Sequence, residues 1–336
     1  MDNTIANFGN LLKIQLKQQK QLDLIIAYGL AALTMTYLSY SLPNLLPGDF
    51  VTTMYSNSFV TITAEQEAEL RNFYSTDAGF GDYIIRLLKL DWGFSYSSLT
   101  PVSSLFFSAL PWTLLLMGSA NFISIFIGFV TGVEAAWQRD SKTEKTMVST
   151  MTIMEGIPEI CTGVILLAIF SLHYQWFPAA GAETAYANHT LIEQFLDVAH
   201  HLALPLLSLI FAYLPGNFLM ARNSMVMVLK QSYITTARAK GLSALRIRYA
   251  HAARNALLPV VTRFCLRLSF MVTGALVVER IHSYPGLGTL LFNAIQARDL
   301  PVIQAVVLVS SLMVLAIILS LELLYGIIDP RVTHAH

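Results

Sequence analysis

The sequence predicts an all-α, polytopic membrane protein with six transmembrane helices. Its 336 residues are 55% hydrophobic and only 12% charged, whereas a soluble domain carries roughly a quarter charged residues. A helix needs about 20 apolar residues to cross a hydrocarbon layer ~30 Å thick. Six segments are long and apolar enough for this: residues 24–43, 110–137, 147–177, 202–221, 259–281 and 302–327.

The placement of basic residues predicts the orientation of these helices. The formal net charge is zero, but 14 of the 21 Lys and Arg residues fall in four places that alternate along the chain: 13–20, 139–145, 222–254 and Arg331. Lys and Arg near the ends of spans hold loops in the cytoplasm. We therefore expect these segments, and both termini, on the cytoplasmic side of the membrane.

The spans divide the chain into five parts. We expect a cytoplasmic N-terminal segment (1–23), a first transmembrane helix (24–46), an external insertion (47–108), a core with the five other helices (109–328) and a cytoplasmic tail (329–336). The insertion holds three basic and seven acidic residues, which suits the outer side. The first 20 residues are polar and lack a small-residue cleavage site, so we expect the first span to be retained.

Apolar residues in the N-terminal segment recur at helical spacing among Lys and Gln: Ile5, Phe8, Leu12 and Leu16. This pattern is typical of an amphipathic helix on the inner leaflet, and equally of a solvated leader to the first span. Both interpretations stay open.

The sequence lacks motifs for chemistry of its own. It contains no Gly-Lys pair, and therefore no Walker A loop for ATP, and it has no G-x-S-x-G or H-E-x-x-H pattern. Cys161 and Cys265 lie in apolar runs and are expected to be free, buried thiols. Asp197, His200 and His201 have a spacing that could place three metal ligands on one helical face. They lie at a span entrance, where polar residues are expected, so we predict no metal site.

The stretch Tyr233–Pro259 carries six basic side chains, counting His251, and no carboxylate. It lies between the fourth and fifth predicted spans. Residues 231–240 read as a short helix that Gly241 ends, and Ser243 can cap a second helix that runs to Leu258. A short helix between two spans is suited to docking a soluble partner. The alternative is a basic loop that only fixes topology.

This stretch resembles the cytoplasmic loop of a known family, the inner-membrane permeases of dipeptide, oligopeptide and nickel ATP-binding-cassette importers. The resemblance rests first on Tyr233, Thr236, Ala237, Arg238, Ala239, Lys240, Gly241 and Leu242, and on Asn255 and Pro259 after them. Pro47-Gly48-Asp49, the H-L-x-L-P pattern that begins at His201, and Pro285-Gly286-Leu287-Gly288 extend it along the chain.

The resemblance implies a permease subunit that transports di- or oligopeptides or a related small solute, or alternatively nickel or a metal chelate. It implies two ATPase subunits that bind ATP and Mg²⁺, so this chain itself would bind no cofactor. It further implies a second homologous permease in a heterodimer, an extracytoplasmic substrate-binding protein, and a place in the cell inner membrane. Nucleic acid is not among the implied partners. In the implied mechanism the short helix near 231–242 couples to the ATPase through the eight residues from Tyr233 to Leu242 given above.

Two rival functions remain. An intramembrane enzyme would use Asp197, His200 and His201, and would be active as a lone chain. A secondary transporter would show two repeated halves, and we find no internal repeat.

Four charged residues inside the predicted spans depart from the family pattern. Glu155 and Glu159 lie in the third span, and Arg263 and Arg267 in the fifth, each pair four residues apart and so on one helical face. A charge in lipid costs ~2.5–3.5 kcal/mol even on insertion scales. We hypothesise that these groups pair across the bundle or line the translocation path. The alternative is a packing role without substrate contact.

Overall fold

The computed structural model describes residues 2–45, 47–56, 63–74, 79–185, 187 and 189–328, with the side chains of 2–22, 271–274 and 323–328 left out. Within these ranges the chain is helical, and its one β interaction is an isolated bridge between Phe94 and Pro101. The first part contains α1 (Asp2–Asn44), α2 (Phe50–Ser56), α3 (Ala64–Tyr74), α4 (Phe80–Leu88), α5 (Val102–Trp137), α6 (Lys142–Glu155), α7 (Glu159–Leu166) and the π-helix η1 (Leu167–His173). The second contains α8 (Leu191–Leu229), α9 (Ser232–Ala239), the π-helix η2 (Arg246–Ala253), α10 (Arg254–Ser269), α11 (Met271–Ile281), α12 (Leu287–Ala297) and α13 (Leu300–Ile328).

Four of the described helices are long and apolar enough to cross a membrane: Asp23–Asn44 of α1, α5, α8, and Leu300–Glu322 of α13. The third predicted span is broken, because α6 and the α7–η1 helix meet at 92°. The break lies at Pro158, whose ring cannot continue the helical hydrogen bonds and keeps the preceding residue out of the helical conformation. Counted as one span, this bent pair brings the number to five.

The fifth predicted span, 259–281, is divided at Phe270 into α10 and α11. Helix α10 has only 16 residues and carries Arg254, Arg263 and Arg267, so it does not qualify as a span by length and composition. The multi-pass membrane architecture is therefore confirmed, whereas the number of six spans stays a prediction.

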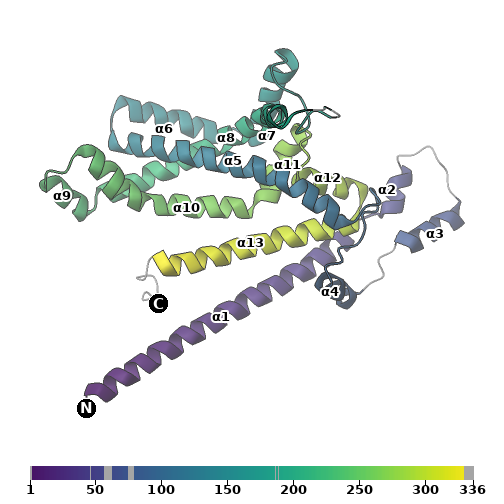
Figure 1. Cartoon of the computed structure of the whole chain (residues 1–336), viewed down its shortest axis with the longest axis horizontal. Helices are drawn as coiled ribbons and strands as arrows, with labels where there is room; N and C mark the ends of the chain where they lie inside the picture. The colour runs from purple at the N-terminus through teal and green to yellow at the C-terminus, as the bar shows by residue number, and fades with distance from the viewer. Residues whose placement is uncertain are drawn as a thin grey trace.

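The helices form a bundle with different elements at its two ends (Figure 1). Helices α2, α3 and α4 lie at one end, and α9 lies at the opposite end, beyond α5 and α8. Helix α1 runs along α13, and the phenol of Tyr28 donates to Glu322 across them (2.8 Å). The side of α1 away from α13 exposes Ile25, Leu30 and other apolar residues, as suits a helix that faces lipid.

Helices α5 and α8 share the most extensive contact of the bundle. A Cβ atom on Gly132 would lie 2.7 Å from the carbonyl oxygen of Phe218, and one on Gly128 would lie 3.0 Å from the amide nitrogen of Phe218. The backbones thus touch at these glycines, as in other close membrane helix pairs. Beside them, Asn217 donates to the hydroxyl of Ser124 (3.0 Å). Small residues therefore fix the distance between these two helices.

The segment 47–108 is held together by polar and aromatic contacts. Arg71 of α3 pairs with Asp49 (2.6 Å), and Asp49 also accepts a bond from the amide of Thr52 (2.7 Å). The rings of Phe50, Tyr74 and Tyr96 pack in one cluster, tilted or edge to face, with centroids 4.9–5.7 Å apart.

The two cysteines are free, as predicted, but their predicted burial is only partly right. Cys265 is half-buried, whereas Cys161 is exposed. An apolar run does not reveal which side of a helix faces the bundle, and α7 turns Cys161 away from it.

Replacing Gly132 with Val should disrupt the α5–α8 contact, because the new side chain would meet the backbone of α8. Overpacking of this kind costs typically 1–3 kcal/mol. We expect a lower midpoint of thermal unfolding and less folded protein after detergent extraction. Gly118→Val on the same helix is the control, since a Cβ there meets nothing within 4 Å. Equal stability of the two variants would contradict the close approach.

Candidate functional site

Helix α9 has sharply defined ends. Gln231 precedes it in an extended conformation (φ −74°, ψ 146°), and Gly241 follows it with φ +72°, in the left-handed region. The amide of Gly241 donates to the carbonyl oxygen of Arg238 (2.9 Å), and the amide of Leu242 donates to the carbonyl oxygen of Ala237 (3.3 Å). These bonds cap the last turn, and a glycine at this position avoids the steric cost of a left-handed conformation.

Two apolar residues anchor α9 to the bundle. Ile234 and Ala237 are 1% and 6% exposed, and they lie in one buried cluster with Val133 of α5, Met225 of α8 and Ile247 of η2. Buried side chains therefore fix α9 to the bundle. Helix α9 is packed against the ends of the two helices that form the central contact.

The anchoring decides which of the predicted coupling residues face outward. Ala237 is buried within its own chain and Leu242 packs against the same cluster, so neither presents its side chain freely to a partner. The six others are exposed: Tyr233, Thr236, Arg238, Ala239, Lys240 and Gly241. They form an outward surface of α9 that carries two positive charges and no carboxylate.

A second set of contacts, which sequence reasoning missed, fixes the segment after α9. Arg248 of η2 donates to both carboxylate oxygens of Glu134 at the end of α5 (2.6 and 2.7 Å) and lies over the ring of Trp137 (4.7 Å). Tyr249 donates to the same carboxylate, and this hydrogen bond raises the pKa of Tyr249. The sequence did contain a signal for Glu134. It is a single carboxylate at the end of a span, and the basic stretch offers it a partner.

A third contact joins α6 to α8. Glu144 is 4% exposed and accepts a hydrogen bond from the Nε of Arg222 (3.0 Å). Its carboxylate also accepts from the backbone of Asp140 (3.2 Å). The sequence places Arg222 among the predicted cytoplasmic charges. In the structure its side chain connects α8 to α6.

The four charged residues of the third and fifth predicted spans come together around one stretch of α8. Arg263 donates to the carbonyl oxygen of Gly216 (3.0 Å). A Cβ on Gly216 would lie 2.9 Å from Glu155 Oε1 and closer still to the guanidinium of Arg263, so both side chains converge there. Gly216 thus leaves the space in which the two charges meet.

The second pair of charges lies beside Tyr213, one turn from Gly216. The guanidinium of Arg267 stacks on the Tyr213 ring at 3.9 Å, and it interacts electrostatically with Glu159. Neither glutamate makes a salt bridge shorter than 4.0 Å with either arginine in the described parts of the chain. The structure brings the four residues together, and their role stays a proposal.

Glu279 of α11 has a structural role. Its buried carboxylate accepts hydrogen bonds from Thr113 Oγ1 (2.6 Å) and from the amide of Thr289 (3.0 Å). The amide of Leu287 donates to Thr113 Oγ1 (2.7 Å). A Cβ on Gly286 would clash with the carboxylate of Glu279. The Pro-Gly-Leu-Gly sequence is therefore needed for the start of α12 to approach this carboxylate.

Asp197, His200 and His201 make contacts within the chain. Asp197 accepts from the amide and the hydroxyl of Thr184 (2.6 and 2.7 Å), and His201 Nδ1 lies 3.4 Å from Asp197 Oδ1. His200 Nε2 lies 2.8 Å from the carbonyl of Trp176. Over the described residues, no group of three His, Cys, Asp or Glu side chains could hold a metal ion. These residues attach the preceding loop to α8.

The charge cluster yields a double-mutant prediction. Arg267→Met should leave Glu159 without its compensating charge and lower stability by about 1–3 kcal/mol. Adding Glu159→Gln should restore most of this loss, because it removes the uncompensated carboxylate. Thermal unfolding in detergent measures both effects, with Arg246→Met at an exposed position as the control. Strictly additive losses would contradict the interaction.

Comparison with known proteins extends over nearly the whole chain. The oligopeptide transport system permease protein AppB of Bacillus subtilis (strain 168) is 35% identical over 306 residues, which cover 90% of this chain and 95% of that protein. The dipeptide transport system permease protein DppB of Escherichia coli (strain K12) is 33% identical over 321 residues (89% and 94%). The di/tripeptide transport system permease protein DppB of Pseudomonas aeruginosa (strain UCBPP-PA14) is 32% identical over 318 residues (89% and 94%).

A family description also matches the chain directly. The model of the family "binding-protein-dependent transport system inner membrane component" matches residues 124–334. This range begins within α5 and includes α8, α9, the charge cluster and the start of α12. The chain therefore belongs to the family of inner membrane components of binding-protein-dependent transport systems.

Proposed function

We propose that this chain is the permease subunit of an ATP-driven importer of di- or oligopeptides. Family membership supports a transport component, and the three similar proteins above are all named as peptide permeases. These names favour peptides over nickel or a metal chelate. A transport role also fits Asp197, His200 and His201, since their contacts within the chain explain them without enzymatic chemistry.

The observation that carries the proposal is the construction of α9. Its buried side is fixed to α5, α8 and η2 through Ile234 and Ala237, while its outward surface carries Arg238 and Lys240. We propose that this surface docks into a groove of a separate ATPase. Because α9 is packed against the bundle, a displacement of α9 by the ATPase would be passed to α5 and α8.

The proposed complex holds two ATPase subunits, which bind ATP and Mg²⁺, and a second, homologous permease. An extracytoplasmic binding protein would deliver the substrate to the segment 47–108. This assigns α9 and both termini to the cytoplasm and α2 to α4 to the outer side. The positions of these helices at opposite ends of the bundle are compatible with that assignment (Figure 1). The positive charges of the α9 end support it.

We further propose that Glu155, Glu159, Arg263 and Arg267 contribute to the translocation path. They provide both signs of charge around Gly216 and Tyr213, on three elements that meet at α8. A peptide with free ends is zwitterionic, so its ammonium and carboxylate groups could exchange with such partners during passage. Charged residues inside membrane spans often mark a substrate or ion pathway.

Gly241→Val tests the coupling. Its Cβ would meet no atom within 4 Å, but the left-handed conformation at φ +72° costs a β-branched residue roughly 1–2 kcal/mol. The end of α9 should shift, so ATP hydrolysis by the purified complex should no longer drive dipeptide uptake into proteoliposomes. Gly181→Val is the matched control, because Gly181 has φ +90° and no contact for a Cβ shorter than 3.7 Å, and it lies outside both α9 and the segment 47–108.

Full uptake by the Gly241→Val complex would contradict the coupling role. The unmodified complex tests the substrate at the same time, because we expect ATP-dependent uptake of a labelled dipeptide. Uptake of nickel without uptake of peptide would instead support the metal alternative.

A further inference from the structure

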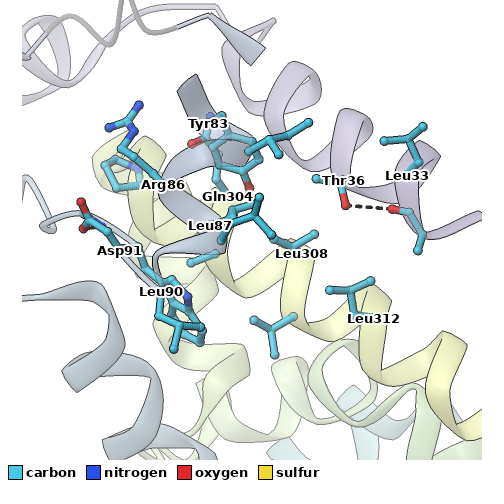
Figure 2. Close-up of a pocket in the computed structure, with 18 of the residues that line it drawn as sticks. Leu33, Thr36, Tyr83, Arg86, Leu87, Leu90, Asp91, Gln304, Leu308 and Leu312 are labelled. Atoms are coloured by element: carbon cyan, nitrogen blue, oxygen red, sulfur yellow. Dashed lines mark hydrogen bonds between the residues drawn. The ribbon is translucent and has the colours of Figure 1, made fainter. Parts of the chain in front are cut away.

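A cavity of about 620 Å³ lies between α1, α13 and α4 (Figure 2). This volume is in the range of small-molecule sites, roughly 300–1,000 Å³. The cavity exists because the facing helices carry small residues there: Gly29 and Ala32 on α1, and Ala305 on α13. It is separate from α9 and from the four intramembrane charges.

The cavity has charged side chains at one end and is mostly apolar along the rest of its length. Figure 2 shows Arg86 and Asp91 at one end, and Leu33 and Leu312 toward the other. Exposed side chains of α4 extend this apolar surface: Leu88, which lines the cavity, is 80% exposed, and Ile85 beside it is 50% exposed. An apolar surface of this kind on a short amphipathic helix is typical of a helix at the membrane interface.

The depth of the cavity matches one leaflet of a bilayer. Tyr83 of α4 contacts the hydroxyl of Ser39 (3.3 Å), which sets the level of α4 along α1. Gly29 lies ten residues before Ser39 on α1, a distance of ~15 Å at 1.5 Å per residue. The hydrocarbon core is ~30 Å thick, so the cavity reaches from the interface to about the middle of the membrane.

The charged end suits a phosphate group with an ammonium group beside it. Arg86 is half-buried, and among the described residues its guanidinium makes no ion pair. Arginine binds phosphate through paired N–H donors. Asp91 is exposed at the same end, where its carboxylate accepts the amide of Gly93 (3.0 Å). A zwitterionic head group complements both side chains.

We propose that this cavity holds one acyl chain of an ethanolamine phospholipid from the bilayer, with its phosphate on Arg86 and its ammonium group on Asp91. A single acyl chain enters from the lipid phase without leaving polar groups unpaired. Arg86 and Asp91 complement the phosphate and ammonium groups of its head group.

Native mass spectrometry of the full chain, extracted with its co-purifying subunits from membranes that contain ethanolamine and glycerol phospholipids, tests the proposal. Gly29→Phe fills the cavity, and a Cβ there meets nothing within 4 Å. Leu30→Phe is its control, at a position 61% exposed on the same helix. Arg86→Gln removes the phosphate contact, and Lys89→Gln removes an equal charge directly after α4, at a residue that does not line the cavity.

We expect one ethanolamine phospholipid to stay bound to the wild type and to both controls. Gly29→Phe and Arg86→Gln should each lower its occupancy, by about tenfold in the dissociation constant for the loss of one such contact. Equal occupancy in all variants would overturn the proposal, as would retention of glycerol phospholipid in preference. Loss of a co-purifying permease from Gly29→Phe, with bound lipid unchanged, would show that a protein helix occupies the cavity and would also overturn it.

Discussion

The close approach of α5 and α8 is the constraint on which the rest of the structure depends. Gly128 and Gly132 allow the two backbones to touch, and Ser124 and Asn217 add a hydrogen bond between them. In a membrane, lipid competes equally for apolar side chains, so helices associate through such close packing and polar contacts. This contact positions the C-terminal half of α8, where the side chains of Arg263 and Glu155 meet at Gly216.

The same contact builds the support for α9. Val133 and Ala136 of α5 and Met225 of α8 come together just beyond the glycines, and they form the cluster that receives Ile234 and Ala237. Glu134, between the two α5 residues, holds Arg248 of η2. A force applied to the outward surface of α9 therefore acts on packed side chains and an ion pair. This gives the proposed coupling a continuous physical connection from α9 into the bundle.

Much of this architecture could be predicted from the sequence, because apolar length and turn chemistry are local properties. The long runs predicted α1, α5, α8 and α13, and Gly241 predicted the end of α9 close to where it lies. Other features depend on tertiary contacts. Ala237 faces inward because α9 packs on α5, α8 and η2, which periodicity over eight residues does not reveal. The break at Phe270 has no proline or glycine beside it that would mark it in the sequence.

Some features of the polar contacts could likewise be predicted from the sequence, and others could not. The i, i+4 spacing of Glu155 with Glu159, and of Arg263 with Arg267, predicted that each pair shares one face. It could not show that the pairs meet at Gly216 and Tyr213, because that depends on the position of α8. Likewise, the pairing of Glu134 with Arg248 joins residues 114 positions apart, and no local pattern connects them.

Chemical cross-linking from α9 tests the central claim most directly, namely that its outward surface docks a separate ATPase. In a chain with Cys161→Ser and Cys265→Ser, a single cysteine at Thr236 should cross-link to the co-purifying ATPase through a short bismaleimide. A cysteine at Lys89, directly after α4 at the opposite end of the bundle, should not. Cross-linking from Lys89→Cys with none from Thr236→Cys would contradict the account.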